Sequence, residues 1–169
     1  SRWSYPYIKE LYDAGVVSGT SATTFSPAAN VTRAQFVTML AGLAGADVSN
    51  CPATPFRDVP EGAWYAPYVN WALANGIVSG TSAVTFSPDA SITRQDMAVM
   101  LYSYTQRFQV HLQQQPVKPF TDADSVAAYA QVAVQTLQRA GVISGMPDGS
   151  FQPYGTATRE QACTMLCML

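Results

Sequence analysis

The sequence of 169 residues is short of charged residues and of histidine, and both shortages exclude classes of function. Charged residues make up 12% of the chain and its formal net charge is -2, whereas a typical globular protein has about 25% charged residues. Nucleic acids and anionic membranes attract proteins with a basic field. Neither partner is therefore expected for this chain.

Metal-binding and membrane-spanning patterns are also missing. His111 is the single histidine, and the three cysteines show no CxxC spacing, so we predict no metal site and no other cofactor. No apolar run approaches the roughly 18 residues of a transmembrane helix, so we expect no membrane insertion. Hydrophobic residues nevertheless form 48% of the chain, which predicts a globular protein with a packed core.

Internal repetition is the strongest positive signal. Residues 3–36 align without a gap with residues 64–97, and both align with residues 129–162. We therefore predict three tandem repeats, of which the first is incomplete at its start and the third is trimmed at its end. Their predicted boundaries are 1–49, 50–115 and 116–169.

Each repeat is predicted to form two helices joined by a loop. In the second repeat, a helix over about 64–75 ends at Gly76, where a left-handed cap costs little. The next helix begins with Thr93 as its N-cap, and Asp96 three positions later approximates a capping box. The same pattern in the other repeats predicts a mainly α fold, whose units are too small to bury their apolar faces alone.

The loops between the helices leave room for short strands. The segment 147–151, which reads PDGSF, is the strongest case, because Asp148-Gly149 favours a turn between two extended segments.

An arginine follows the N-cap threonine in every repeat, as Arg33, Arg94 and Arg159. A cation in the first turn of a helix is mildly unfavourable, so the helix itself does not explain these residues. One hypothesis is a structural ion pair with Asp58 or Asp122. The other, which we favour, is an anion site formed by free N–H groups of the helix start and the guanidinium. On that hypothesis, Arg94→Ala weakens binding and leaves stability nearly unchanged.

Three further positions recur in all repeats, and each has a structural and a functional interpretation. The glycines suit an unusual backbone conformation or a close approach, and the serine hydroxyls suit either a local backbone bond or a sugar hydroxyl. The aromatic residues are expected to pack in the core, with stacking on a sugar as the alternative. These residues are Gly19, Gly80 and Gly145; Ser18, Ser79 and Ser144; and Trp3, Trp64 and Tyr129.

The phrases FRDVP, GIVSG, FSP and ITR, in this order, closely resemble the S-layer homology domain, whose signature near the second helix is ITRAE. The resemblance covers essentially the whole chain. It implies three helix-loop-helix repeats in a pseudo-threefold arrangement, with ligand grooves between neighbouring repeats. It also implies a non-catalytic module of a larger extracellular protein, located in the cell wall or S-layer of a bacterium.

The ligand implied by the resemblance is secondary cell wall polysaccharide, commonly with a pyruvylated amino sugar. The family's ligand-contacting arginine corresponds to Arg33, Arg94 and Arg159. The final acid of ITRAE is Gln35, Asp96 or Gln161 in this chain, so a role that needs a carboxylate is open in two repeats. All three residues still suit helix capping. Ala157 precedes the third TR phrase and is smaller than its counterparts, which ranks the third site lowest.

Two other classes of function compete with wall binding. A glycosidase needs two carboxylates about 5 to 10 Å apart, but Asp58 and Asp122 stand in the setting of a turn or a helix cap. His111 has no repeated partner, so no nucleophile and base pair is expected either. A structural or assembly module, with grooves that bind a protein partner, remains the alternative to wall binding.

Overall fold

The predicted pair of helices is present in every repeat. The computed structural model describes residues 3–15, 17–19 and 24–169. Within them the α-helices are α1 (Tyr5–Asp13), α2 (Arg33–Ala44), α3 (Ala66–Ala74), α4 (Arg94–Arg107), α5 (Gln131–Arg139) and α6 (Arg159–Cys167), and two 3-10 turns, Ala123–Ser125 and Ala128–Ala130, precede α5. The mainly α prediction is confirmed. None of these helices is long and apolar enough to cross a bilayer.

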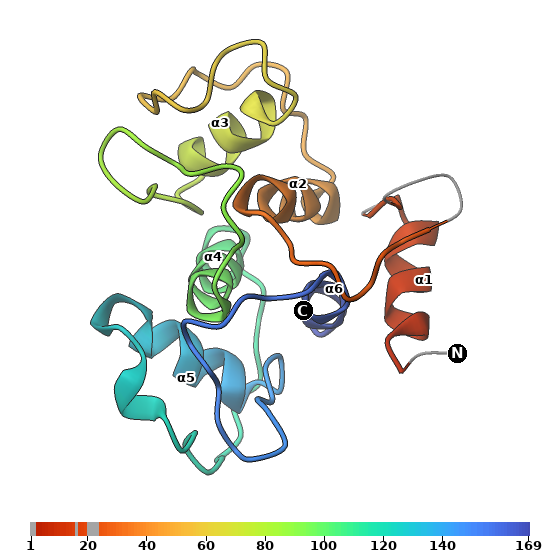
Figure 1. The fold of residues 1–169 in the computed structure, drawn as a ribbon, viewed down its shortest axis with the longest axis vertical. Coiled ribbons are helices and arrows are strands. Elements are labelled where there is room, and N and C mark those ends of the chain that lie inside the picture. The colour runs from red at the N-terminus through yellow and green to blue at the C-terminus, as the bar shows by residue number, and fades with distance from the viewer. Residues whose placement is uncertain (1–2, 16, 20–23) are drawn as a thin grey trace.

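The helices form an inner and an outer set in a pseudo-threefold arrangement (Figure 1). The second helices of the repeats, α2, α4 and α6, surround the centre, and the first helices lie outside them. Helix α3 packs against α2, α5 against α4, and α1 against α6. Every outer helix therefore packs against the inner helix of a neighbouring repeat, and the contact between α1 and α6 closes the ring.

A closed triangle of backbone hydrogen bonds joins the three repeats at the start of the inner helices. The N–H of Val31 donates to Ala157 O at 3.0 Å, that of Ile92 to Val31 O at 2.9 Å, and that of Ala157 to Ile92 O at 3.2 Å. All three residues are fully buried. Since unpaired backbone groups are costly in a core, the triangle stabilises the arrangement of all three repeats together.

The β pairing in the described residues is limited to three isolated bridges beside this triangle, Asn30 with Thr158, Thr32 with Ser91, and Thr93 with Thr156. The expectation of strands at 147–151 is wrong. That segment forms a turn in which the N–H of Gly149 donates to Met146 O at 2.9 Å. The carboxylate of Asp148 accepts from the N–H of Ser150 at 2.9 Å. The side chain therefore closes a local turn, and this N–H is not available for pairing with a second strand.

Both predicted helix boundaries are confirmed. The outer helices are followed by glycines at positive φ, for example Gly76 at 70° and Gly141 at 77°. At the start of the inner helices, the hydroxyls of Thr32, Thr93 and Thr158 accept the backbone N–H three residues on, at 3.1, 3.2 and 3.3 Å. Local sequence therefore determines where these helices begin and end, because the caps involve only residues that are close in sequence.

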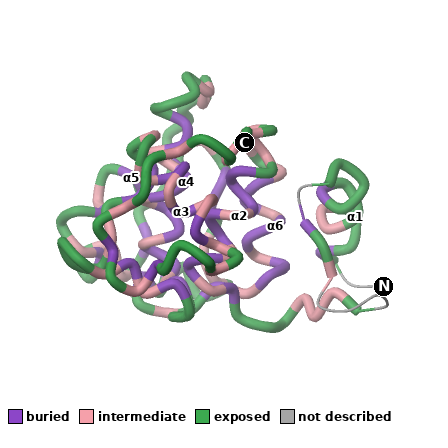
Figure 2. Tube along the Cα trace, turned by 90° about the horizontal axis from the view of Figure 1, so that it is seen from above, coloured by how far each residue is buried: buried purple, intermediate pink, exposed green. Residues whose placement is uncertain are grey.

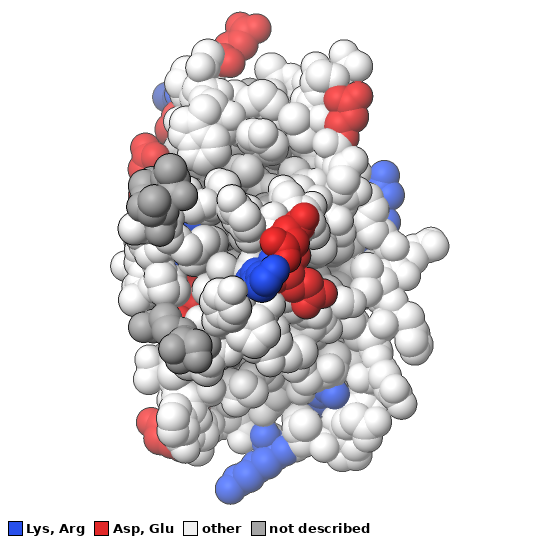
Figure 3. All heavy atoms as spheres, turned by 90° about the vertical axis from the view of Figure 1, so that its right-hand side faces the viewer, with Lys and Arg blue, Asp and Glu red and all other residues white. Residues whose placement is uncertain are grey.

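Buried residues concentrate on the inner helices and on the parts of the loops that cover them (Figure 2). Phe36, Leu40 and Leu101 of the inner helices are fully buried, as are Phe86 and Phe151 of the loops. Charged side chains are sparse on the face on the α1 side (Figure 3).

Candidate functional site

Each repeated arginine lies at the junction between its own repeat and the next one. Arg33, at the start of α2, donates from Nε to Phe86 O of the second repeat at 2.8 Å. Its guanidinium carbon is 4.9 Å from the centroid of the Phe86 ring, a cation–π geometry. The side chain is buried, with 6% of its surface exposed. The same two contacts, at 2.7 and 5.0 Å, join Arg94 to Phe151, and at 2.9 and 4.3 Å they join Arg159 to Phe25.

The ion pairs of the alternative hypothesis, between these arginines and Asp58 or Asp122, are not present among the described residues. The Asp58 carboxylate accepts the backbone N–H groups of Phe86 and Ser87 at 2.9 and 2.8 Å. Asp122 holds the corresponding loop of the third repeat in the same way. The aspartate thus holds the N–H of the loop phenylalanine while the arginine holds its carbonyl, so both residues fix this loop.

The helix starts are also not free to bind an anion, contrary to our prediction. The N–H of Arg33 donates to Ala90 O at 2.9 Å, and the N–H of Ala34 donates to Pro88 O at 3.0 Å. The third N–H is held by Thr32. Equivalent carbonyls cover the starts of α4 and α6. Because the loop of the next repeat satisfies these donors, only the guanidinium remains available for a negatively charged ligand.

The terminal guanidinium nitrogens differ between the three junctions. Nη1 of Arg33 forms an ion pair with Asp96 at 3.2 Å, and Nη2 of Arg159 donates to Ser18 O. No described residue accepts a bond from Nη1 or Nη2 of Arg94. Among the described residues, Thr54 Oγ1 is the one fully buried polar side-chain atom without a partner, so these Arg94 nitrogens retain contact with solvent. Burial lowers the pKa of all three arginines.

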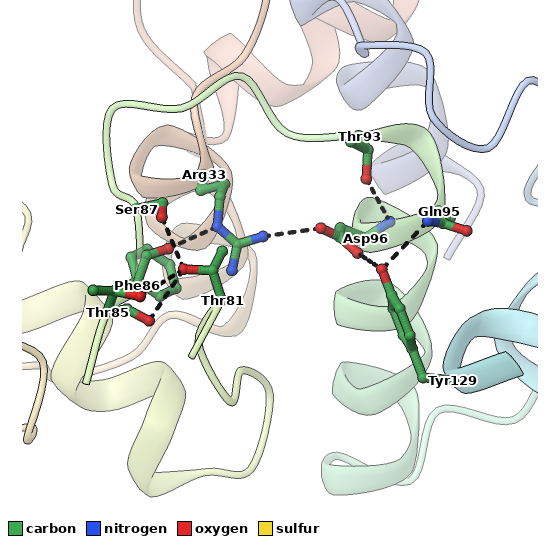
Figure 4. A network of polar contacts seen from close by, with 9 residues as sticks. All are labelled: Arg33, Thr81, Thr85, Phe86, Ser87, Thr93, Gln95, Asp96 and Tyr129. Atoms are coloured by element: carbon green, nitrogen blue, oxygen red, sulfur yellow. Dashed lines mark hydrogen bonds and ion pairs between the residues drawn. The ribbon is translucent and has the colours of Figure 1, made fainter. Parts of the chain in front are cut away.

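A cavity of about 480 Å³ lies beside the Arg33 junction. We call it the Asp96 pocket. Its wall is the loop 76–81, which includes Ser79 and Gly80, and its floor is the α4 face of Val99, Met100 and Ser103. Its polar end is formed by Arg33, Asp96 and Tyr129 (Figure 4). All three repeats contribute to this pocket.

A second cavity, of about 340 Å³, lies at the equivalent place in the first repeat. The loop residues Gly15, Val17 and Ser18 form one side, and Thr38 of α2 with Tyr68 of α3 forms another. Nη2 of Arg159 donates to the carbonyl oxygen of Ser18, which is one of the residues that line this cavity. Arg33 and Arg159 thus each reach the loop of the repeat that follows in the ring, which the sequence alignment did not reveal.

The aligned aromatic residues lie at the surface, so their predicted core packing is wrong. The exposed fractions of Trp3, Trp64 and Tyr129 are 60%, 58% and 64%. The Tyr129 hydroxyl donates to Asp96 Oδ1 at 2.5 Å, at the end of the Asp96 pocket. Burial of that end, together with the hydrogen bond, raises the pKa of Tyr129 to about 12. The exposed ring leaves an aromatic face available to a ligand.

Comparison with known proteins decides the family. A family model described as the S-layer homology domain matches residues 1–37, 55–98 and 119–163. The chain belongs to the S-layer homology domain family. The three matched segments each lie within one predicted repeat, and the repeat boundaries themselves stay predictions.

Relatives that carry this domain are much longer proteins. The chain is 39% identical to an endoglucanase of Bacillus sp. (strain KSM-635), over 99% of the chain but 18% of that protein. It is 28% identical to a cellulosome-anchoring protein of Acetivibrio thermocellus, over 90% of the chain and 35% of that protein. The S-layer protein sap of Bacillus anthracis is 25% identical, over 97% and 20%. The predicted location of this S-layer homology domain, at the bacterial cell surface, is confirmed.

The last position of the S-layer homology signature behaves differently in the second repeat than in the other two. Gln35 and Gln161 complete capping boxes, in which the side-chain oxygen accepts the N–H of the N-cap threonine at 3.0 Å. Asp96 does not, because its carboxylate is bonded to Arg33 and Tyr129. The prediction that all three residues cap their helices therefore holds for the two glutamine side chains only.

The glycines have the predicted structural role at two of three positions. Gly80 has φ of 88°, and a Cβ there would lie 2.6 Å from the Phe56 ring. Gly145 has φ of 78°, and its Cβ would lie 2.5 Å from the Phe120 ring. Gly80 also lines the Asp96 pocket, so backbone and ligand roles are compatible there. Gly19 is half-buried, and residues 20–23 beside it lie outside the described residues.

The repeated serines, Ser18, Ser79 and Ser144, are exposed in the loops that follow the outer helices. Ser79 lines the Asp96 pocket and Ser18 lines the second cavity. No described residue forms a hydrogen bond with the hydroxyl of Ser18, Ser79 or Ser144, so the predicted local backbone bond is not observed. The hydroxyls remain available to a ligand.

Sequence reasoning missed two polar residues of the Asp96 pocket, Thr81 and Ser103. A signal for Ser103 was present, since Asp96, Val99, Met100 and Ser103 follow the spacing of one helix face. Thr81 carried no comparable signal. The described residues contain no cluster of three or more His, Cys, Asp or Glu side chains that could hold a metal.

Proposed function

We propose that this chain is a non-catalytic module that anchors its protein to the bacterial cell wall by binding secondary cell wall polysaccharide. The Asp96 pocket carries this proposal. It brings a guanidinium, the Ser79 hydroxyl and the exposed Tyr129 ring, one from each repeat, to one cavity of about 480 Å³. Such a combination of hydrogen-bonding groups and an aromatic face suits a sugar, whose hydroxyls and apolar ring face both need partners.

A pyruvylated amino sugar is the ligand unit that we propose. A pyruvate ketal carries a carboxylate, and a guanidinium holds a carboxylate through charge-assisted hydrogen bonds. Arg94 supports this assignment, because its two terminal nitrogens have no acceptor among the described residues and retain contact with solvent. Its Nε donates to Phe151 O. This bond orients the guanidinium, and with it the two terminal nitrogens, before a ligand binds.

The carboxylates that recur in the repeats support a non-catalytic role. Both oxygens of Asp58 and of Asp122 accept backbone N–H groups, and a carboxylate held in this way fixes a loop instead of transferring a proton. Some relatives are named as enzymes, such as the endoglucanase, but this chain corresponds to 18% of that protein. The names of the cellulosome-anchoring protein and the S-layer proteins agree with anchoring.

The test is a calorimetric titration with purified wall polysaccharide, in its native form and after removal of its pyruvate ketals. We expect saturable binding of the native polymer and much weaker binding of the stripped polymer. Equal binding of both forms contradicts a role for the pyruvate carboxylate. No binding of either form favours the alternative, in which the grooves bind a protein partner.

Tyr129→Ala tests whether the exposed ring takes part. Because the ring is 64% exposed, its removal should leave the fold intact and lower polymer affinity by about fivefold to tenfold, as expected for a loss of roughly 1 kcal/mol in an aromatic contact. Tyr12→Ala is the matched control, since Tyr12 is 60% exposed and lines neither cavity. Equal affinities of the two variants would remove the Tyr129 ring from the site.

A further inference from the structure

The three repeats place two glutamines and one aspartate at the third position of the inner helix, and only the aspartate lines the Asp96 pocket. Gln35 and Gln161 turn back to their own N-cap threonines at 3.0 Å. Asp96 cannot do the same while its two oxygens bond Arg33 Nη1 at 3.2 Å and the Tyr129 hydroxyl at 2.5 Å. Its side chain is 25% exposed and lines the Asp96 pocket.

The Asp96 carboxylate takes the place on Arg33 that a ligand carboxylate would need. Figure 4 shows the two side chains facing each other, with Tyr129 approaching Asp96 from the other side. A ligand carboxylate on the same guanidinium would stand next to Asp96, and like charges in a partly buried site repel strongly. Displacing Asp96 instead would break both its ion pair and its bond to Tyr129.

Building on the proposed function, we propose that Asp96 is a specificity-determining residue that divides the grooves between two kinds of sugar unit. The Asp96 pocket takes an uncharged unit of the polymer, and the carboxylate-bearing unit is held at Arg94. The two glutamines leave the arginines of the other grooves without a neighbouring acid at this position.

The remaining lining of the Asp96 pocket suits an uncharged sugar. Asp96 retains acceptor capacity for a sugar hydroxyl, because an ionised carboxylate offers about four lone-pair sites and two are used here. Ser79, Thr81 and Ser103 add hydroxyls, and Val99 and Met100 form an apolar floor. A unit with hydroxyls and no carboxylate therefore finds partners without opposing a fixed charge.

Asp96→Gln tests the proposal, because it places in this repeat the residue of the other two. Its matched control is Asp89→Asn, which removes one negative charge from an exposed position of the same repeat. Asp96→Asn is a second variant that keeps the shape of the side chain. Each protein is titrated by calorimetry with native polysaccharide and with polymer stripped of its pyruvate ketals, after circular dichroism has verified its fold.

We expect Asp96→Gln and Asp96→Asn to add a site for the native polymer, or to tighten its binding by about tenfold to a hundredfold, the effect of one charge-assisted contact. Binding of the stripped polymer should not rise. Unchanged or weaker binding of the native polymer by both variants overturns the proposal, as does an equal gain in Asp89→Asn. If the unmodified chain does not distinguish the two polymers, the proposed pyruvate ligand fails first, and the division of grooves fails with it.

Discussion

The junction at Arg33 and the junction at Arg94 are built from the same parts and differ in one acid. In both, a buried arginine holds the carbonyl of a loop phenylalanine, at 2.8 Å for Phe86 and 2.7 Å for Phe151. In both, the next repeat covers the N–H groups of the helix start. Asp96, however, forms an ion pair with Arg33 at 3.2 Å, whereas no described residue accepts a bond from the terminal nitrogens of Arg94.

The arginines have a structural role that all three junctions share, and it is distinct from the proposed role in ligand binding. The Nε bond and the ring contact are common to all three junctions and close the ring of repeats. The terminal nitrogens differ in their partners: Nη1 of Arg33 pairs with Asp96, Nη2 of Arg159 donates to Ser18 O, and those of Arg94 have no acceptor among the described residues. The same arginine can therefore stabilise the fold through its Nε and ring contacts and bind a ligand through its terminal nitrogens. Different substitutions test these two roles.

The largest effect on stability is expected from the equivalent glycines of the two junctions, Gly80 and Gly145. Gly80→Ala and Gly145→Ala each combine a positive φ with a Cβ that would lie 2.6 or 2.5 Å from a phenylalanine ring. Backbone strain and overpacking each cost about 1 to 3 kcal/mol, so we expect a loss of roughly 3 kcal/mol or more in the free energy of unfolding.

The matched controls are Gly76→Ala and Gly141→Ala, which have φ of 70° and 77° with nothing within 4 Å of the added Cβ. They should lose about 1 kcal/mol from backbone strain alone. Thermal unfolding of the four variants provides the comparison. Equal losses in all four would show that the close contacts of the added Cβ, with a phenylalanine ring and with loop carbonyl oxygens, do not matter.

The next effect concerns the arginines themselves. Arg94→Ala removes a charge-assisted bond to Phe151 O and the contact with its ring, and we expect it to cost about 2 to 3 kcal/mol, or roughly 5 to 10 °C in Tm. This replaces the expectation from sequence that the variant would keep its stability, because Arg94 is only 3% exposed.

Arg33→Ala should lose at least as much, since it also breaks the pair with Asp96. Arg57→Ala, at an exposed arginine, is the control and should lose less than about 0.5 kcal/mol. An unchanged Tm for Arg94→Ala would contradict the structural role of the junction.

The smallest effect is a titration that only the Arg33 junction should show. The Tyr129 phenol has a pKa raised from 10.0 to about 12 by burial and by its bond to Asp96. Because the folded-state pKa exceeds the unfolded one, the contribution to stability is complete below pH 10 and is lost as the pH rises toward 12.

Ultraviolet absorbance of tyrosinate, compared between the chain and Tyr129→Phe, measures this pKa. In Asp96→Ala the phenol should titrate closer to its ordinary value near 10, because the hydrogen-bond acceptor is gone. A pKa that does not move would show that burial alone raises it.

Local sequence patterns determined the elements of this protein. The three repeats, the helix ends at Gly76 and Gly141, and the threonine N-caps were all predicted and are all observed. These features depend on residues a few positions apart, whose geometry is fixed by the helix itself. The position of Arg33 at a helix start could be read in the same way, and the sequence also indicated that something outside the helix holds it.

Only the tertiary structure decided which groups meet. Arg33 and Phe86 are 53 positions apart, and Arg159 and Phe25 are 134 apart, so no local pattern could pair them. The same ring of repeats covered the helix N–H groups that the sequence left open, and it placed Tyr129 on the surface beside Asp96. Side chains such as these take their role from the neighbouring repeat, because a single repeat cannot bury its own apolar face.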